Sequence, residues 1–402
     1  MRKFWLSSLL GLLLAIAPVE FAHSQEGTEA LGTPVGAFIM YPSLTVDTEY
    51  NDNIFATDGN EEDDIIFRIK PSVNIESDWD NHSLQFLSSA TFNQYVDNTS
   101  EDVIDYEFLS SGRLDILEDT FLFGSAGVNR THEDRTSADD VQGDEPTQYT
   151  VIGGNIDFHH RFNRAWTELN NTVQHLNYDD VSGGPGITID NDDRDRLETH
   201  SRLRAGYDFN PEVSAFLQGH FGVEKYDETP DSPGVSRDAY QYGVAAGFRF
   251  DITDLIVGDA FAGYQWREQD DDAFGDENTY EVGAGLTWFA TELTTANLNA
   301  SRHWEETTVA GSSSALTTIV GVGVNHSLLD TVTLSGHVDY TNEDFEGTNR
   351  TDETYSFGPE VIYLVNRFVH LSLGYNYEQR DSDAATEDYT IHSVVLSTRF
   401  QY

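Results

Sequence analysis

The stretch YTIHSVVLSTRFQY, from Tyr389 to Tyr402, ends the chain and contains a regular alternation of apolar and polar residues. An alternation with a period of two predicts a β-strand that has one apolar and one polar face. The apolar positions are Val394, Leu396, Phe400 and Tyr402, and the polar positions are Ser393, Ser397, Arg399 and Gln401. Because no further residue follows, the strand is expected either to be an exposed edge or to close a barrel by pairing with another strand.

The composition narrows the possible partners. The 402 residues include 70 acidic and 22 basic side chains and carry a formal net charge of -48 at pH 7. A charge of this sign repels phosphate backbones and argues against a nucleic-acid partner. The absence of Cys excludes a disulfide framework and thiol-ligated metals. Length alone allows either several soluble domains or one large β structure.

The N-terminus resembles a secretory signal. Arg2 and Lys3 precede an apolar stretch from Phe4 to Ala17, and Ala22-His23-Ser24 form a small-x-small cleavage site. We expect residues 1–24 to be a cleaved signal peptide, 25–36 a short periplasmic segment and 37–402 a single domain. An uncleaved anchor is the alternative. No later apolar run is long enough for a helix to span a membrane, so insertion must use strands.

Short polar turns and long polar loops alternate along the rest of the chain. The eight short turns are Trp79–His82, Leu117–Thr120, Phe162–Arg164, Phe209–Glu212, Phe250–Asp254, Phe289–Glu292, Leu329–Thr331 and Val365–Arg367. The nine long loops are Asn51–Asp63, Asp97–Asp102, His132–Pro146, Asp179–Asp192, Asp227–Ser236, Gln269–Asn278, Glu305–Ser314, Glu343–Arg350 and Asp381–Thr386. Together they predict about eighteen strands, with sixteen as the alternative, in an antiparallel up-and-down β-barrel of the outer membrane with short periplasmic turns and long extracellular loops. The final strand should then pair with a first strand within Phe38 to Tyr50.

The segments between turns favour a membrane barrel over a soluble β-sandwich. They run to about ten to fifteen residues, whereas strands of soluble sheets are usually about five or six residues long. Aromatic residues near the short turns, including Phe400 and Tyr402, are expected in a periplasmic girdle. Four near the long loops are expected in an outer girdle: Tyr226, Trp266, Trp304 and Tyr377. Ordinary core aromatics of a soluble protein are the alternative.

Two segments near the start of the mature chain resemble a known family. Gly36 to Thr57 contains Pro42-Ser43-Leu44 and the run Tyr50 to Phe55, and Asp63 to Leu84 contains Pro71-Ser72-Val73 ahead of Ser77-Asp78-Trp79. These features are similar to those of the putative outer-membrane β-barrel proteins of the BBP2 type. The resemblance implies a role in the export of exopolysaccharide or capsule, with periplasmic export components as partners.

The final strand also resembles the assembly signal of outer-membrane barrels, an amphipathic strand with aromatics at its end. Phe400 and Tyr402 supply those aromatics. The resemblance implies recognition by the barrel-assembly machinery, while outer-membrane lipids and lipopolysaccharide are the expected surroundings. Simple closure of the sheet is compatible with this role.

Basic residues concentrate on one face of the segment from Asp193 to Asp208. That face carries Arg194, Arg196, Glu198, His200, Arg202 and Arg204. Arg161 and Glu168 on neighbouring strands are expected to join it. Charged rows in a lumen select solutes, so these residues are candidates for selectivity. The alternative is a set of salt bridges that fills a wet interior.

Acidic loops raise the question of a metal. Three loops carry Asp58, Glu61 to Asp64; Asp190, Asp192, Asp193 and Asp195; and Asp270 to Asp272, Asp276 and Glu277. Such oxygen ligands suit divalent cations, but Phe274 interrupts the EF-hand pattern and solvated loops are the favoured interpretation. We therefore expect no bound metal or cofactor, although loose binding of divalent cations at the loops is compatible with the sequence.

An enzyme is not expected. The chain has neither a G-x-S-x-G elbow nor an H-E-x-x-H motif. The alternative is a catalytic or metal-binding cluster of His159, His160 and His175. The sequence predicts an outer-membrane conduit or assembly component, most plausibly for exopolysaccharide. The alternatives are a general or solute-specific diffusion porin, and a surface adhesin or structural barrel.

Overall fold

The computed structural model describes residues 30–228, 234–252, 255–271 and 273–402. The expected signal peptide, residues 1–24, lies outside the described residues. Among the residues that are described, no helix is both long enough and apolar enough to cross a membrane.

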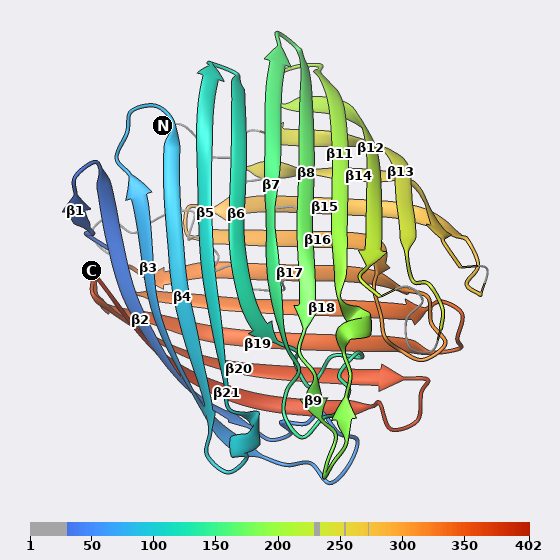
Figure 1. The fold of residues 1–402 in the computed structure, drawn as a ribbon. Coiled ribbons are helices and arrows are strands. Elements are labelled where there is room, and N and C mark those ends of the chain that lie inside the picture. The colour runs from blue at the N-terminus through green and yellow to red at the C-terminus, as the bar shows by residue number, and fades with distance from the viewer. Residues whose placement is uncertain (1–29, 229–233, 253–254, 272) are drawn as a thin grey trace.

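Eighteen long antiparallel strands of the described chain form one closed barrel (Figure 1). They are β2 Phe38–Asn51, β3 Asp64–Ser77, β4 Ser83–Tyr95, β5 Val103–Leu117, β6 Thr120–His132, β7 Gln148–Phe162, β8 Ala165–Tyr178, β11 Arg196–Asp208, β12 Val213–Tyr226, β13 Ala239–Ile252, β14 Ile256–Gln269, β15 Glu277–Thr291, β16 Thr294–Glu305, β17 Ala315–Leu329, β18 Val332–Phe345, β19 Thr351–Asn366, β20 Val369–Ser382 and β21 Tyr389–Gln401. The expected eighteen strands are confirmed, and the alternative of sixteen is wrong.

Short elements of the described residues lie outside the barrel wall. They are β9 Val181–Ser182, β10 Thr188–Ile189 and the single-turn 3-10 helices η1 Thr99–Glu101 and η2 Asp192–Arg194, whereas the short β1 Thr33–Val35 pairs with β2 in the barrel sheet. Strands β9 and β10 pair with each other inside the long loop between β8 and β11. The long loops therefore carry some regular structure of their own.

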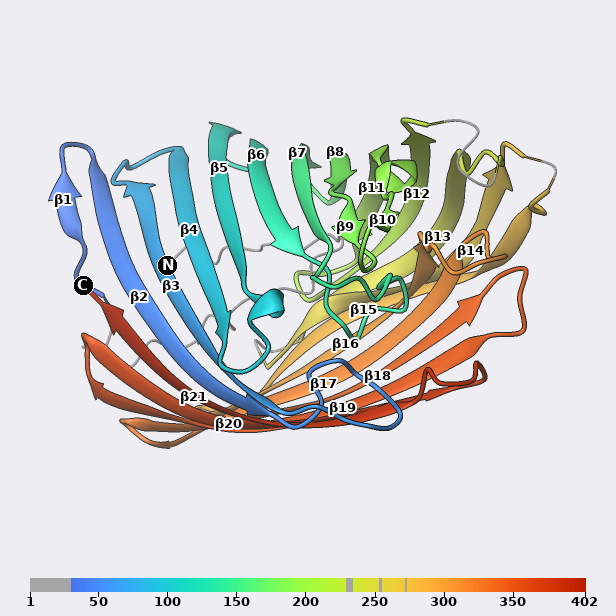
Figure 2. The same cartoon turned by 60° about the horizontal axis from the view of Figure 1, so that its bottom comes forward.

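The barrel closes between its first and last strands. β21 pairs with β20 on one side and with β2 on the other, from Ser43 opposite Gln401 to Asn51 opposite Ser393. Figures 1 and 2 both show the blue β2 beside the red β21. The predicted pairing of the final strand is confirmed. Closure removes the unpaired backbone groups that a sheet edge would expose to lipid.

Short and long connections alternate as the sequence predicts. Between the strands, each of the eight expected turns falls at one end of the barrel and each of the nine expected loops at the other. Strand β11 begins at Arg196, so the expected start at Asp193 is wrong. The spacing of two between arginines continues from Arg196 back to Arg194 in η2, which is why the sequence does not reveal this boundary.

Side chains on the barrel strands alternate between the outer surface and the lumen. On β2, Asp47 and Glu49 line the lumen, while Leu44 and Tyr50 are exposed on the other face. On β3, Arg68 lines the lumen and Phe67 is exposed outside. The outer face is therefore apolar and suited to lipid, while the inner face is polar.

The aromatic residues follow the expected girdles only in part. Phe400 and Tyr402 are exposed at the short-turn end, where the Tyr402 ring stacks on Phe368 at 5.9 Å. Tyr226 and Trp304, expected in the outer girdle, are only 7% and 5% exposed. The Tyr226 hydroxyl instead donates a hydrogen bond to Glu306 of a loop. A lumen-facing position of Tyr226 accounts for this error.

The segment before the barrel covers β2 at the short-turn end of the barrel. β1 pairs with Phe38 to Met40, which precede the part of β2 that pairs with β21. The Gly32 amide also donates a hydrogen bond to the Tyr402 carbonyl at 3.1 Å. Gly32 has a φ of +67°, and a Cβ there would lie 2.4 Å from Ile39, so only glycine fits readily. Residues 32–35 thus seal the seam.

One side of the lumen is filled by aromatic rings. Trp166 on β8 is 2% exposed, and Phe216 on β12 is 3% exposed, although both point inward. Gly206 on β11 lies opposite Trp166 and leaves room for its indole. The Arg249 guanidinium stacks on the Trp166 ring at 4.3 Å. The rings occupy this side of the cavity, and Arg202 and Arg204 beside them on β11 are also buried.

Replacing Gly206 tests this packing. The Cβ added by Gly206→Ala would lie 2.2 Å from the Trp166 ring, so we expect a loss of about 1–3 kcal/mol in stability. The measurement is the temperature at which the refolded barrel loses its compact migration on a semi-native gel. Gly285→Ala is the matched control, because a Cβ there has no atom within 4 Å. Equal transition temperatures for the two variants would contradict the expectation.

Candidate functional site

The candidate functional site is the lumen, which has a volume of 3690 Å³. Its lining includes Trp79 and His82 at the short-turn end, and Glu101, Glu133 and Glu306 among the long loops. The cavity therefore extends from one end of the barrel to the other. A path of this length lined by polar groups can hold water and small solutes.

The lumen is strongly acidic. Among the described residues, its lining contains 24 Asp and Glu side chains and 11 Arg side chains, and no Lys. The carboxylates thus outnumber the cations by thirteen. Confinement within low-dielectric walls strengthens the resulting potential and raises the local concentration of cations.

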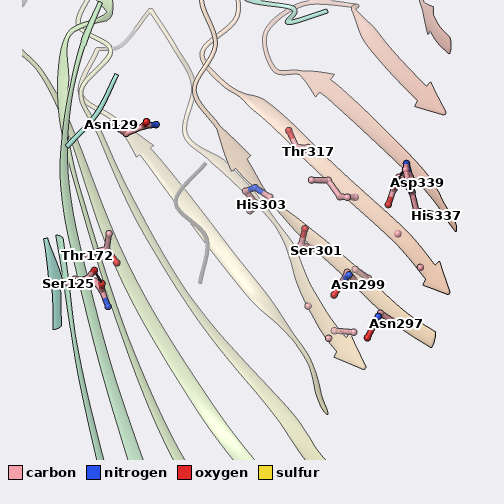
Figure 3. Close-up of a pocket in the computed structure, with 18 of the residues that line it drawn as sticks. Ser125, Asn129, Thr172, Asn297, Asn299, Ser301, His303, Thr317, His337 and Asp339 are labelled. Carbon is pink, nitrogen blue, oxygen red and sulfur yellow. Dashed lines mark hydrogen bonds and ion pairs between the residues drawn. The ribbon is translucent and has the colours of Figure 1, made fainter. Parts of the chain in front are cut away.

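The wall formed by β16 to β18 presents neutral hydrogen-bonding groups. Asn297, Asn299, Ser301 and His303 follow one another along β16 and face the open lumen (Figure 3). Thr317 and His337 extend this surface across β17 and β18, where Asp339 adds a carboxylate, and Ser125, Asn129 and Thr172 lie on the other wall. Amides and hydroxyls both donate and accept, so this wall suits polar solutes of either charge or none.

The sequence-predicted basic face of β11 does point inward. Arg196, Glu198, His200, Arg202 and Arg204 all line the lumen. The arginines are nevertheless packed into the wall, with exposed fractions of 8%, 9% and 4% for Arg196, Arg202 and Arg204. The predicted location is therefore correct, but these guanidinium groups do not extend freely into the open channel.

Most of these charges are paired. Arg196 donates to Glu198 at 2.7 Å, and Arg204 donates to Gln218 at 2.7 Å and to Asp259 at 3.3 Å. Such pairs stabilise the wall and agree with the alternative that these residues form salt bridges in the interior. Removal of one partner would leave a buried charge.

The two candidates on neighbouring strands are also paired. Arg161 forms an ion pair with Asp208 at the short-turn end. Glu168 receives two hydrogen bonds from Arg249, both 3.0 Å long, and lies 3.3 Å from His159. Arg249 is not among the selectivity candidates predicted from the sequence, although the alternation on β13 places it on the lumen face.

Arg194 is not on a barrel strand. It lies in η2, is 4% exposed, and donates to both carboxylate oxygens of Glu133 at 2.7 and 3.0 Å. Its expected place in the basic row of a strand is therefore wrong. Arg194 instead joins two long loops at the mouth of the barrel.

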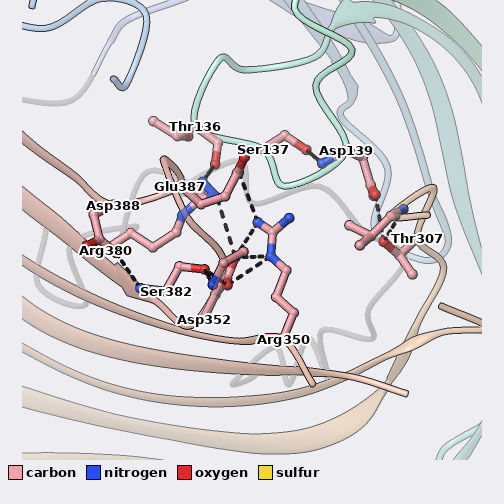
Figure 4. Close-up of polar contacts among 12 residues, drawn as sticks. Thr136, Ser137, Asp139, Thr307, Arg350, Asp352, Arg380, Ser382, Glu387 and Asp388 are labelled. Atoms are coloured by element: carbon pink, nitrogen blue, oxygen red, sulfur yellow. Dashed lines mark hydrogen bonds and ion pairs between the residues drawn. The ribbon is translucent and has the colours of Figure 1, made fainter. Parts of the chain in front are cut away.

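The loop between β6 and β7, residues 133–147, crosses the mouth of the lumen. Asp139 accepts hydrogen bonds from the Thr307 hydroxyl and the Thr308 amide, both 2.7 Å long, on the loop between β16 and β17. In another direction, Arg380 of β20 donates to the Thr136 carbonyl (Figure 4). Residues 133–147 are therefore attached to wall segments far from their own strands, and we name them the crossing loop.

Charged contacts within the mouth stabilise the crossing loop. Arg135 donates to Glu101 through two hydrogen bonds of 2.9 Å and to Asp140 at 3.1 Å. Burial raises the pKa of the Asp140 carboxyl, although Arg135 opposes this effect. The loop thus depends on side chains from several surrounding loops. Nothing in its own sequence identifies these distant partners.

A buried cluster behind the crossing loop was missed by sequence reasoning. Arg267 of β14 is 0% exposed and forms ion pairs with Glu224 and Glu306. Burial favours the neutral form of Glu306, but the charge of Arg267 outweighs it and lowers the pKa of Glu306. The alternation on β12 and β14 predicts the inward direction of Glu224 and Arg267, but not their pairing.

The histidines considered as a catalytic cluster are not brought together. His159 contacts Glu168, while His160 points to the opposite face and hydrogen bonds with Thr120. His175 pairs with Asp227 near the long loops. The suggested cluster is therefore wrong, because neighbouring residues on a strand face opposite sides.

The acidic loops have different roles from one another. Asp64 accepts hydrogen bonds from the backbone amides of Asp97 and Asn98, and Asp195 accepts one from the Tyr178 amide. Asp180, Asp190 and Asp192 bring carboxylate oxygens within 4.8 Å of one another on the surface. Asp272 lies outside the described residues. Several of the acidic groups therefore satisfy backbone amides.

Breaking the tether of the crossing loop should widen the mouth. In Asp139→Ala, the hydrogen bonds from Thr307 and Thr308 are lost, which weakens the docked loop by about 1.5–3 kcal/mol. We expect a larger single-channel conductance or more frequent steps to a larger conductance in planar bilayers. Asp144→Ala is the control, because Asp144 lies in the same loop but accepts from Ser182 of the β9–β10 hairpin. Identical current traces for wild type and Asp139→Ala would contradict a role of this tether.

Comparison with solved structures gives similar barrels at low sequence identity. Pseudomonas aeruginosa OpdO is 10% identical, with 92% of this chain and 98% of that chain covered and a TM-score of 0.49. Acinetobacter baumannii OccAB4 is 11% identical, with coverages of 94% and 100% and a TM-score of 0.47. Pseudomonas aeruginosa OccK2 (OpdF), solved in complex with glucuronate, is 11% identical, with coverages of 90% and 98% and a TM-score of 0.48. No curated protein matches the sequence.

Comparison with protein families gives a match over almost the whole chain. The sequence model of the family described as "Putative beta-barrel porin 2" matches residues 26–402. The match includes every strand of the barrel and agrees with the resemblance noted from the first two strands. The chain therefore belongs to this family of β-barrel porins and is a multi-pass protein of the outer membrane.

Proposed function

We propose that this porin is a passive diffusion channel for small polar solutes, with a preference for cations over anions. The observation that carries the proposal is the continuous lumen, whose lining has 24 carboxylates against 11 guanidinium groups. Rings of charge at a pore select ions of opposite sign. The amides and hydroxyls of β16 to β18 would provide alternative hydrogen bonds for solutes that lose part of their hydration shell.

The crossing loop argues for small solutes over an extended polymer. It is tied to Thr307 on one side and to Arg380 on another, so a wide polysaccharide chain would have to displace it. Export of exopolysaccharide, which the family resemblance implied, therefore requires an additional opening step. Diffusion requires no such step, and this favours the porin alternative.

Ion selectivity in planar bilayers tests the proposal. With a tenfold KCl gradient, we expect a reversal potential that indicates a K⁺ permeability greater than the Cl⁻ permeability. The preference should decrease at high salt because ions screen the lumen charges. In the double variant Asp339→Asn/Glu360→Gln, two lumen carboxylates become neutral, and we expect a smaller preference for K⁺. Asp58→Asn is the control, because Asp58 is an exposed loop residue outside the lumen lining.

Swelling of proteoliposomes in small sugars gives an independent measurement. Uptake that decreases steeply with solute size supports a diffusion porin. A protein that neither conducts ions nor admits sugars, but whose deletion abolishes secretion of a polymer, would contradict passive diffusion and support export.

A further inference from the structure

Among the described residues, two lumen guanidinium groups, those of Arg202 and Arg399, have no protein acceptor, and only Arg202 is buried. Arg202 is 9% exposed and lines the lumen near the middle of β11. Among the residues that the structure describes, none forms a hydrogen bond or an ion pair with its guanidinium. Arginine remains protonated in proteins, so Arg202 is a largely buried positive charge whose N–H donors have no acceptor among the described residues.

The nearby carboxylates are already committed to other groups. Those whose charge acts on Arg202 are Glu168, Asp259, Asp157 and Glu281, and Glu281 accepts a hydrogen bond from Gln218 at 3.2 Å. Glu168 accepts two hydrogen bonds from Arg249, and Asp259 accepts one from Arg204. Asp157 accepts hydrogen bonds from the Asn155 and Asn170 amides. The neighbourhood therefore reduces the potential at Arg202 but offers the guanidinium no direct counter-ion.

The groups beside Arg202 leave access only from the lumen. Asn170 of β8 and His220 of β12 lie opposite Arg202 on the two neighbouring strands. The rings of His200 and His220 stack at 5.6 Å, and all four side chains line the cavity. A water molecule can satisfy some of the donors, but it cannot neutralise the charge. A solute that enters the lumen can do both.

We propose that Arg202 forms the centre of an anion subsite that binds one oxyanion group, a carboxylate or a phosphate, of a permeating solute. The planar guanidinium presents parallel N–H donors that match two oxygens of such a group. Arg204, whose guanidinium is held by Gln218 and Asp259, adds positive charge on the same face of β11. The subsite lies within an otherwise acidic lumen, so it would hold an anionic group at one position without making the whole channel anion-selective.

The inference rests on the proposed porin function for its biological meaning, but binding can be measured without transport. The test is calorimetric titration of the folded protein in neutral detergent at low ionic strength, with inorganic phosphate and acetate as separate probes and glycerol as the uncharged control. We expect saturable binding of at least one oxyanion and none of glycerol. Saturation by phosphate alone or by acetate alone would identify which oxyanion the subsite prefers.

The variant Arg202→Gln should weaken binding by about tenfold or more, because the hydrogen bonds to a charged acceptor are lost. Arg113→Gln is the matched control: it removes the same charge from the lumen lining, but Arg113 is already hydrogen bonded to Asp115 at 2.9 Å. Arg202→Lys is a second variant that retains the charge. Its single ammonium group cannot form the parallel pair, so we expect intermediate affinity.

Two results would overturn the subsite: no saturable binding of either probe to the wild-type protein, or equal affinities for the wild type and Arg202→Gln. If Arg202→Gln does not fold, an affinity of Arg202→Lys equal to that of the wild type would also overturn it. Proteoliposome swelling separates the two proposals. Normal sugar uptake without oxyanion binding would reject the subsite alone, whereas oxyanion binding without any uptake would reject the diffusion function.

Discussion

The pairing of β2 with β21 is the constraint on which the rest of the structure depends. Lipid provides no hydrogen-bond partners, so each backbone N–H and C=O group at membrane depth must find one within the protein. The seam has nine residue pairs, fewer than the fourteen between β2 and β3. β1 and the Gly32 amide extend the seam at its short-turn end. The aqueous interior exists only because this ring is complete.

Inside that ring, the chain carries more charge than the lumen can leave solvated. Arg204 lies against the Phe216 ring and, like Arg196 and Arg202 of β11, is buried in the wall, where an unpaired charge is costly. The structure responds by pairing Arg196, Arg204 and Arg249 with acceptors from the same or other strands. The same arginines therefore stabilise the barrel and shape the potential of the channel. Arg202 is the exception within this part of the wall.

Much of the fold was predictable from the sequence because strand alternation and turn composition are local. The pairing of the final strand follows from the count of turns and loops, and the inward direction of Arg196 to Arg204 follows from residue parity. The start of β11 was not predictable, since the spacing of two between arginines continues from Arg196 back to Arg194 across the strand boundary. Burial of Tyr226 was missed for a different reason: it depends on Glu306, which lies 80 positions further along the chain. Cross-lumen contacts depend on register and curvature, which single strands do not encode.

The crossing loop also has a consequence for the order of assembly. Its partners Thr307 and Arg380 lie 168 and 244 positions away from Asp139 and Thr136, on segments that enter the barrel late in the chain. The loop therefore cannot dock until strands near the C-terminus have been inserted. A partly inserted barrel would have an open mouth, and only the finished barrel would have a narrow one. The contacts that restrict permeation therefore form only after insertion of the strands is complete.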